Sequence, residues 1–437
     1  MDHIKNALDS LTCATPRKPE ELMDKDKEKY KTFITLGEDA EAEKKHPVPE
    51  VEWVQGYTHG KCAAHPHAAV PTSDGGYLLV GDCTTYHGTG DVGTGEDWPA
   101  NLKRAILVTK TNATGDFEWS CRFGHIGMNY GKFGAELPDG TFVVGGVAAV
   151  DDDSCPSDFL YVQRRCILRI SKDGKIIKST VFPAANPDDP GRRDGVMGLA
   201  AENGIAEDGG MVVYATGYVS GEAGYNKDTH EYDDDPMFLI NLGRTFVAQL
   251  TFLPVEKEPY GLMAQDPTVS WYTPIEAGTQ GSLAFRQGMR VVIDRLNSQL
   301  AVLTTVCEAE DKFDAQFGCL ALGLDGEVRW AKMYPAKDSS GSHPYALCLS
   351  SNGEYLIAGH AIENGVFTDK GPAGRACKLN PSGGELLWDT RFKQPGQHMN
   401  TECYGICLLT NCNGVLITCG TGVMPDEVSA ATPHLLA

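Results

Sequence analysis

The feature that most constrains the fold is a short block that recurs along the chain: a glycine-containing turn followed by an apolar strand. It occurs as DGGYLLVG (Asp74–Gly81), DGTFVVGG (Asp139–Gly146), DGGMVVYATG (Asp208–Gly217), NGEYLIAG (Asn352–Gly359) and NGVLITCG (Asn413–Gly420). Glycine after aspartate or asparagine supplies the positive φ of a tight turn, and the residues that follow favour a strand. The block therefore predicts a β-hairpin turn and strand that repeat along the chain.

A second recurring block joins two further strands and often ends in tryptophan. Good copies are ILVTKTNATGDFEW (Ile106–Trp119), CLALGLDGEVRW (Cys319–Trp330) and CKLNPSGGELLW (Cys377–Trp388), and weaker ones are ILRISKDGKIIKSTV (Ile167–Val181) and FLINLGRTFVAQL (Phe238–Leu250). The outermost strands are accordingly expected near Trp53, Trp119, Ile177, Val247, Trp330 and Trp388. Together the blocks predict about six units of roughly sixty to seventy residues, each with four strands.

Four-stranded units repeated in this way predict an all-β fold, a six-bladed β-propeller, with seven blades as the alternative. A pair of β-sandwiches is a further alternative, whereas a helical solenoid is excluded by the period-2 strands. The blocks LVTKTNATGDFEW and DGGYLLVG also resemble the repeat of β-propeller proteins that carry a DGGY turn, an LIK.D strand and a closing tryptophan. That resemblance covers most of residues 51–437 and implies architecture alone, because such repeats serve many functions.

Two segments are expected to stand apart from the regular units. Residues 1–50 are rich in charge and predict an extension that is partly helical or flexible, ahead of a single propeller domain at 51–437. Val51–Val54 reads as an outer strand without a partner, and Thr432–Ala437 as a third strand without a fourth. We expect the N-terminal strand to complete the last blade and close the ring; a chain that continues further is the alternative.

The charge balance narrows the classes of partner. The net charge is −21 over 437 residues, which disfavours binding to nucleic acid or to an anionic membrane, since both require a basic face. No apolar run reads as a signal peptide or a membrane span, so we expect no membrane insertion and a cytoplasmic location. An acidic surface permits a basic protein partner or a bound cation.

Polar residues gather where the innermost strand of each unit begins. HPHAAV (His65–Val70) occupies the same repeat position as HPYALC (His343–Cys348). The candidate catalytic residues are His65, His67, His343, His398 and Glu136, and the candidate ligand-binding residues are Tyr130, Lys132, Arg192 and Arg193. Since innermost strands line the centre of a propeller, we expect these side chains to ring one mouth of the channel.

Two kinds of metal site are compatible with these residues. His65 and His343 could hold a transition metal, because neutral imidazoles are good ligands for Zn, Cu or Fe. Asp151, Asp152 and Asp153 lie in an acidic loop whose oxygens suit Ca²⁺, although no twelve-residue calcium-loop pattern is present. The structural alternative is that His-Pro serves only to shape the strand entry and that the acidic loops are solvated.

The sequence therefore supports two functional hypotheses. The first is a scaffold or ligand-binding module that holds a protein partner or small ligand with its acidic loops and channel mouth. The second is an enzyme, in one form metal-dependent, whose pocket is the histidine-ringed mouth. The first is favoured because no Ser-His-Asp order, HExxH or phosphate-binding glycine loop occurs in the chain.

Overall fold

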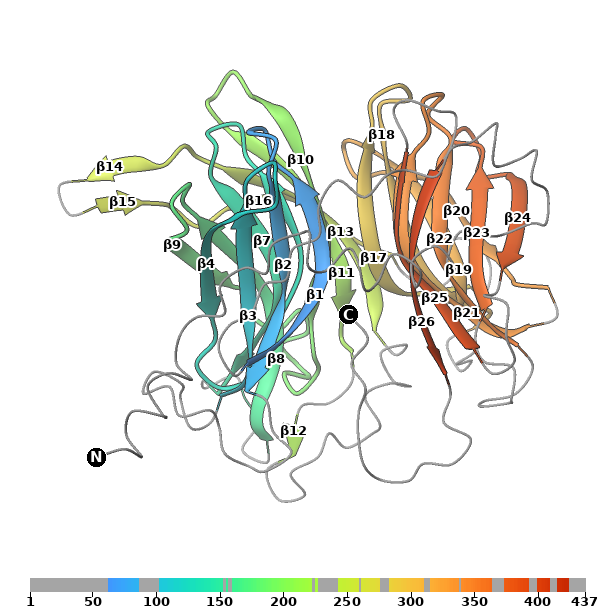
Figure 1. Ribbon diagram of the computed structural model, residues 1–437, viewed down its shortest axis with the longest axis horizontal. Coiled ribbons are helices and arrows are strands. Elements are labelled where there is room, and N and C mark those ends of the chain that lie inside the picture. The colour runs from blue at the N-terminus through green and yellow to red at the C-terminus, as the bar shows by residue number, and fades with distance from the viewer. Residues whose placement is uncertain are drawn as a thin grey trace, which may run out of the picture.

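A computed structural model describes most of the repeat region (Figure 1). It covers residues 62–85, 102–151, 155, 159–221, 225–226, 243–258, 261–275, 283–309, 315–337, 339–363, 373–392, 399–408 and 415–423. The predicted extension at 1–50 and the closing strands at 51–54 and 432–437 lie outside the described residues. In the described part of the chain, no helix has the length and apolar character needed to cross a membrane.

The described strands form six successive units, numbered here in chain order. Unit one contains β1 (Cys62–Pro71), β2 (Tyr77–Thr85), β3 (Leu102–Thr111) and β4 (Phe117–Phe123), and the short β5 (Gly127–Met128) pairs with β3. Unit two contains β6 (Tyr130–Glu136), β7 (Phe142–Val150), β8 (Phe159–Ile170) and β9 (Ile176–Val181), with β12 (Tyr225–Asn226) beside β8. These bounds confirm the two strands predicted within Ile106–Trp119 and the turn and strand predicted within Asp139–Gly146.

Units three to six follow the same plan. Unit three contains β10 (Gly195–Ile205), β11 (Met211–Val219), β13 (Arg244–Phe252) and β16 (Thr268–Pro274), with a separate hairpin of β14 (Glu256–Glu258) and β15 (Gly261–Met263). Unit four contains β17 (Ala284–Asp294), β18 (Gln299–Cys307), β19 (Gln316–Gly323) and β20 (Val328–Tyr334). Unit five contains β21 (Ser339–Leu349), β22 (Tyr355–Glu363), β23 (Ala373–Leu379) and β24 (Leu386–Phe392). Unit six shows β25 (Met399–Leu408) and β26 (Val415–Val423).

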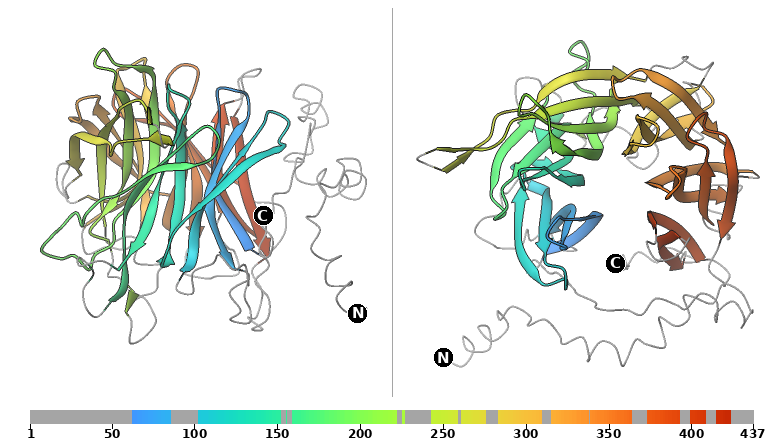
Figure 2. Two further views of the ribbon diagram at one scale, coloured as in Figure 1. Left: turned by 90° about the vertical axis from the view of Figure 1, so that its left-hand side faces the viewer. Right: turned by 90° about the horizontal axis from the view of Figure 1, so that it is seen from above.

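The units stand side by side around a common axis. Seen from above, the colours run in order from blue to red around a ring, with the first strand of unit one on the inside and its later strands toward the rim (Figure 2). Within each described unit the neighbouring long strands pair antiparallel. Four-stranded antiparallel sheets arranged radially define a β-propeller, as the repeat predicts.

The hydrophobic core lies between adjacent sheets. One core cluster, for example, joins Leu78 and Val80 of unit one to Phe142 and Val144 of unit two, and all four side chains are at most 4% exposed. Along Tyr77–Val80 of β2, half-buried residues alternate with fully buried ones, and the buried Leu78 and Val80 pack against unit two. Each unit therefore depends on the next for burial of its apolar face.

Outer-strand tryptophans add a hydrogen bond between consecutive units. The indole Nε1 of Trp119 donates to Lys172 O at 2.9 Å, that of Trp271 to Leu324 O at 3.0 Å, and that of Trp330 to Pro381 O at 3.0 Å. Each acceptor lies in the turn between the third and fourth strands of the following unit. The repeated tryptophan thus has a physical role, which is to join one unit to the next.

The outer strand of unit three corrects one sequence prediction. Val247 lies in β13, which pairs with both β11 and β16, so it belongs to the third strand and is fully buried. The outer strand is β16, which carries Trp271. The excursion through β14 and β15 separates the two strands, so the usual spacing between third strand and tryptophan is lost.

A bulge in each innermost strand explains the glycine that closes the recurring block. In β1 the register shifts between Pro66 and Ala68, which leaves His67 as an extra residue opposite β2. A Cβ on Gly81, opposite Pro66, would lie 2.2 Å from the His65 carbonyl oxygen. In β22 a Cβ on Gly359 would lie 2.1 Å from His343 O in the same way. Glycine is therefore required where the bulged strand approaches closely.

Candidate functional site

The bulges place one extra residue in each innermost strand at the same level of the ring. From unit one to unit six these bulge residues are His67, Lys132, Met197, Met289, Tyr345 and Tyr404. Neighbouring bulge residues contact one another in two places: Lys132 Nζ is 3.4 Å from His67 Nε2, and the rings of Tyr345 and Tyr404 are 5.1 Å apart. This level lies near the middle of the strands: His67 is the sixth of the ten residues of β1, and Tyr404 is the sixth of the ten residues of β25.

The polar members of units one and two form a compact group that we call the inner-end cluster: His65, His67, Asp82, Arg104, Tyr130 and Lys132. Asp82 is central, because Oδ1 lies 2.7 Å from His67 Nε2 and 3.9 Å from His65 Nδ1. Its other oxygen, Oδ2, accepts a hydrogen bond from Arg104 Nη1 at 3.0 Å. The Asp82 side chain is 1% exposed, so these partners replace its hydration.

Asp82 is ionised and determines the tautomer of His67. Burial by itself would raise the pKa of Asp82, but the nearby His65 side chain, the hydrogen bond from His67 and the Arg104 charge outweigh it and hold that pKa well below its usual range. Burial, reinforced by the Lys132 charge, lowers the pKa of His67 to about 4, although Asp82 opposes the shift. Neutral His67 must therefore carry its proton on Nε2 in order to donate to the carboxylate.

Lys132 is then left without an acceptor in the described part of the chain. Its neighbours there are the His67 nitrogen, whose hydrogen is already directed at Asp82, and the Tyr130 ring, 4.9 Å from Nζ. Burial lowers the pKa of Lys132 to about 8; the Asp82 charge opposes this shift and the Arg290 and Arg104 charges add to it. The ammonium is therefore still charged at pH 7 and only partly solvated.

Unit five repeats the arrangement with different chemistry. His343 pairs with His360 across β21 and β22, just as His65 pairs with Asp82 across β1 and β2. The His360 ring lies 5.3 Å from that of His343 and 5.5 Å from that of Tyr345. His360 is 7% exposed, its Nδ1 has no hydrogen-bond partner among the described residues, and burial lowers its pKa to about 4.

The two buried histidines predict a specific loss of stability in acid. Their folded pKa values of about 4 lie below the ordinary histidine value of 6.5, so the unfolded chain binds more protons between these values. The free energy of unfolding is therefore expected to fall as the pH drops from 6.5 to 4, by about 3 kcal/mol at most for each histidine. Urea unfolding at several pH values measures this dependence.

The His360→Leu variant separates this effect from the titration of carboxylates. It is expected to lose less stability than the parent between pH 6.5 and 4, because it lacks one of the two groups. Parallel pH profiles for the parent and the variant would contradict the assignment of His360 as a buried neutral imidazole.

The structure brings together only some of the residues singled out in the sequence. His65, His67, Tyr130 and Lys132 belong to the inner-end cluster, and His343 lies at the equivalent place in unit five. Glu136 lies at the opposite end of β6, where its carboxylate accepts hydrogen bonds from Ser73 N and Oγ at 2.6 Å. It therefore does not join the histidines.

The remaining candidates lie elsewhere. Arg192 pairs with the neighbouring Asp189, and Arg193 donates to Gln163 Oε1 at 3.3 Å. Asp151 is exposed at the end of β7, whereas Asp152, Asp153 and His398 lie outside the described residues. Among the described residues, the three-residue group able to surround a metal is His65, His67 and Asp82, whose ligand atoms lie within 4.8 Å of one another.

Three residues of these two groups were missed from the sequence. Asp82, Arg104 and His360 lie on second and third strands, whereas the sequence argument followed only the first strand of each unit. A signal was present: Asp82 and His360 each come directly after the glycine that closes the recurring block. That position pairs with the histidine of the His-Pro sequence on the neighbouring strand, as Asp82 does with His65 and His360 with His343. A polar residue there therefore indicates a polar cluster.

Comparison with known proteins gives only distant likenesses. No family model matches the sequence, and no curated protein matches it. A Dyadobacter fermentans protein of unknown function is 12% identical, with 76% of this chain and 94% of that chain covered and a TM-score of 0.38. Bacillus subtilis levansucrase is 9% identical, with 78% of this chain and 89% of that chain covered and a TM-score of 0.37. The polysaccharide lyase Uly1 is 11% identical, with 89% of this chain and 85% of that chain covered and a TM-score of 0.36. At these values we transfer no residue role or activity to this chain.

Proposed function

We propose that this protein is a β-propeller that binds a small ligand with an anionic group at the inner-end cluster. The observation that carries the proposal is Lys132, a partly buried ammonium without an acceptor in the described part of the chain. A carboxylate, sulfate or phosphate oxygen placed beside Nζ would supply that acceptor. A charge-assisted hydrogen bond of this kind is stronger than one between neutral groups.

The local charge supports an anion despite the acidity of the whole chain. The net charge is −21, yet the inner-end cluster holds Arg104 and Lys132 against the single carboxylate of Asp82. Arg290 adds to the positive field, since its charge lowers the pKa of Lys132. The acidic remainder of the surface would repel anions at a distance, so a bound anion gains its affinity from these close contacts.

A metal ion fits the same residues less well. Arg104 already occupies Asp82 Oδ2 at 3.0 Å, and Lys132 lies 3.4 Å from the His67 nitrogen that would have to bind the metal. A cation between His65, His67 and Asp82 would therefore sit close to two positive charges. We accordingly favour an anionic ligand over a transition metal at these residues.

An enzyme is the second candidate, supported by the contact between His67 and Asp82. The carboxylate holds the Nε2 hydrogen at a nitrogen–oxygen distance of 2.7 Å, which leaves Nδ1 of the neutral ring as a base. Lys132, with its pKa of about 8, could stabilise negative charge on a reacting group beside it. Under this hypothesis the bound ligand would be turned over rather than merely held.

A panel of small anions tests the binding proposal. Acetate, sulfate, phosphate, citrate and galacturonate would be compared with neutral galactose by thermal shift and by calorimetry. We expect at least one anion to stabilise the parent and the Lys178→Met variant, because Lys178 lies on the outer strand β9 and pairs with Asp266 just before β16. Lys132→Met should lose that stabilisation. Equal stabilisation of all three proteins would contradict the proposal, and consumption of the ligand would favour the enzyme.

A protein partner on the acidic loops forms a separate part of the proposal. Asp151, at the end of β7, is exposed and belongs to one of these loops. Acidic loops on a rigid frame would suit a basic partner. Such an interaction would weaken steeply with added salt, which distinguishes it from ligand binding at the inner-end cluster.

We also propose that the ring has six blades and that Val51–Val54 closes the last one. Trp388 supports this arrangement. Trp388 lies on β24, at the position where Trp119, Trp271 and Trp330 donate an indole hydrogen bond to the following unit. Within the described residues the indole of Trp388 has no such acceptor, and its side chain is 37% exposed. Leu386 and Leu387 beside it are 47% and 48% exposed. Two further strands of unit six, one of them Val51–Val54, would cover this apolar strip.

Deletion of residues 1–58 is expected to lower the melting temperature and cause self-association, because it removes the closing strand and leaves an open sheet edge. Deletion of residues 1–45 is the matched control, since it retains Val51–Val54 and should leave both properties unchanged. Light scattering after size-exclusion chromatography and thermal melting measure the outcome. A monomeric 1–58 deletion with unchanged melting would refute closure by this strand.

A further inference from the structure

A second cation, Arg290, lies near Lys132 at the innermost strands of the ring. It belongs to β17 of unit four, but its guanidinium carbon lies 4.8 Å from the ring centroid of Phe133 in β6 of unit two. Phe133 directly follows Lys132 in the chain, and the Arg290 charge lowers the pKa of Lys132. Two cationic side chains from different units therefore come to the same part of the ring.

Backbone contacts hold the Arg290 side chain in this position. Its Nη1 donates to Met197 O of unit three at 3.0 Å and to Met289 O of its own strand at 2.8 Å. A Cβ on Gly198 would lie 2.8 Å from the Arg290 Cα, so glycine is required where β10 approaches β17. The guanidinium is therefore held between the innermost strands of units two, three and four.

These contacts leave one edge of the Arg290 guanidinium unused. Its Nε and Nη2 have no hydrogen-bond partner among the described residues. The side chain is half-buried, and neither nitrogen is enclosed, so both remain open to solvent. The N–H groups of Nε and Nη2 form a planar fork that matches the two oxygens of a carboxylate. Arg290 is thus prepared to receive such a group.

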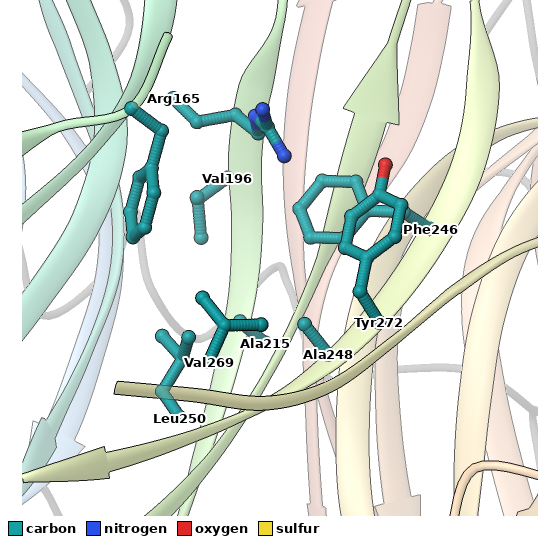
Figure 3. Close-up of a pocket in the computed structure, with 9 residues that line it drawn as sticks. Arg165, Val196, Ala215, Phe246, Ala248, Leu250, Val269 and Tyr272 are labelled. Atoms are coloured by element: carbon teal, nitrogen blue, oxygen red, sulfur yellow. The ribbon is translucent and has the colours of Figure 1, made fainter. Parts of the chain in front are cut away.

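Arg165 lies in a different environment, at a gap between units two and three (Figure 3). Most of the side chains around this gap are at most 3% exposed: Val196, Ala215, Phe246, Ala248 and Leu250. The Arg165 Nε is itself buried there. The gap belongs to the packing of the core, so a ligand has access to Arg290 but not to Arg165.

Neither Lys132 nor Arg290 has a carboxylate partner in the described part of the chain. Asp82 is the carboxylate whose charge acts on Lys132, and it already accepts a hydrogen bond from Arg104. Burial lowers the pKa of Arg290 to about 10, and the charge of no described carboxylate offsets this shift. Both side chains are therefore charged at pH 7, and two negative charges would neutralise them.

We propose that the ligand of the inner-end cluster is a small aliphatic dicarboxylate, an inference that rests on the anion site proposed above. One carboxylate would accept hydrogen bonds from Nε and Nη2 of Arg290, and the other would accept a hydrogen bond from Lys132 Nζ. Lys132 would supply affinity for one anionic group, and Arg290 would select ligands that carry a second. Arg290 is thus the residue that determines specificity.

The test compares malonate, succinate, glutarate and adipate with their monomethyl esters, by calorimetry on the whole protein at pH 7. Each ester keeps one carboxylate and loses the second negative charge. The parent should bind at least one diacid about tenfold or more tightly than its ester. The Arg295→Met control, whose altered side chain pairs with Glu202 on the surface, should do the same. Arg290→Met should bind the diacid and its ester equally.

Arg290→Lys is a second variant that keeps the positive charge but not the planar fork. Its preference for the diacid should fall to a few-fold at most. The proposal is overturned if no diacid binds more tightly to the parent than its ester, or if Arg290→Met or Arg290→Lys keeps the full preference. In either case, ester binding that still depends on Lys132 would leave the anion site itself standing. Absence of binding by every anion would contradict both proposals.

Discussion

Replacing Arg375 with methionine is expected to lower the free energy of unfolding by about 4 kcal/mol, because a fully buried guanidinium and its partners are lost together. The Arg375 side chain is 0% exposed and pairs with Asp389 through Nη2 at 2.7 Å. Its Nη1 donates to Tyr334 O at 2.9 Å and to Ser342 Oγ at 3.0 Å, and its central carbon lies 4.5 Å from the Phe317 ring centroid. Urea unfolding of the two proteins measures the difference.

The size of this effect follows from the position of Arg375 between two units. Tyr334 ends β20 of unit four, whereas Arg375 and Asp389 belong to β23 and β24 of unit five. Arg375→Lys should recover little, since an ammonium cannot make the paired contact with a carboxylate. Arg295→Met, a surface change, is the control. A loss for Arg375→Met no greater than that of the control would contradict the role assigned to this contact.

Replacing Asp82 with asparagine is expected to lower the free energy of unfolding by about 3 kcal/mol. The change removes the negative charge that receives hydrogen bonds from His67 and Arg104, and it leaves Arg104 and Lys132 without a buried counter-charge. Asp82 is 1% exposed, so water cannot replace these interactions without rearrangement. Chemical denaturation at pH 7 gives the measurement.

Asp173→Asn provides a matched control for the same chemical change at the surface. Asp173 pairs with Lys175, but both side chains are more than half exposed, so no measurable loss of stability is expected. Asp82→Asn also separates the two kinds of ligand. If the site bound a metal ion, the substitution would remove one of the coordinating side chains and weaken metal binding. Anion binding measured at pH 6, where Lys132 is charged, should survive. Unchanged stability of Asp82→Asn would contradict the central place given to this carboxylate.

The repeat predicted the fold well because its signals are local. The turns at Gly75, Gly140, Gly209 and Gly353 all show positive φ, of 84°, 74°, 82° and 79°, as the Asp-Gly and Asn-Gly pairs indicate. Such features depend only on neighbouring residues.

Features that depend on distant residues were harder to predict. The outer strand of unit three was assigned near Val247 because Trp271 lies beyond an insertion that no local pattern announces. Likewise, His65, His67, Tyr130 and Lys132 were identified because they lie near the beginning of innermost strands. Their partners Asp82 and Arg104 lie on other strands. Their positions follow from strand register, which is fixed by the bulge at His67 and by its fit against Gly81.

The most direct test of the proposed ligand site is the pH dependence of anion affinity in the parent and in Lys132→Met. The probe is the tightest of acetate, galacturonate and sulfate, whose own charge does not change above pH 6. Since the pKa of Lys132 is about 8, affinity in the parent should be constant near pH 6.5 and fall about tenfold per pH unit well above 8. Lys132→Met should bind weakly and without this inflection. Equal affinity of the parent at pH 6.5 and pH 9.5 would contradict the assignment of Lys132 as the anion-binding group.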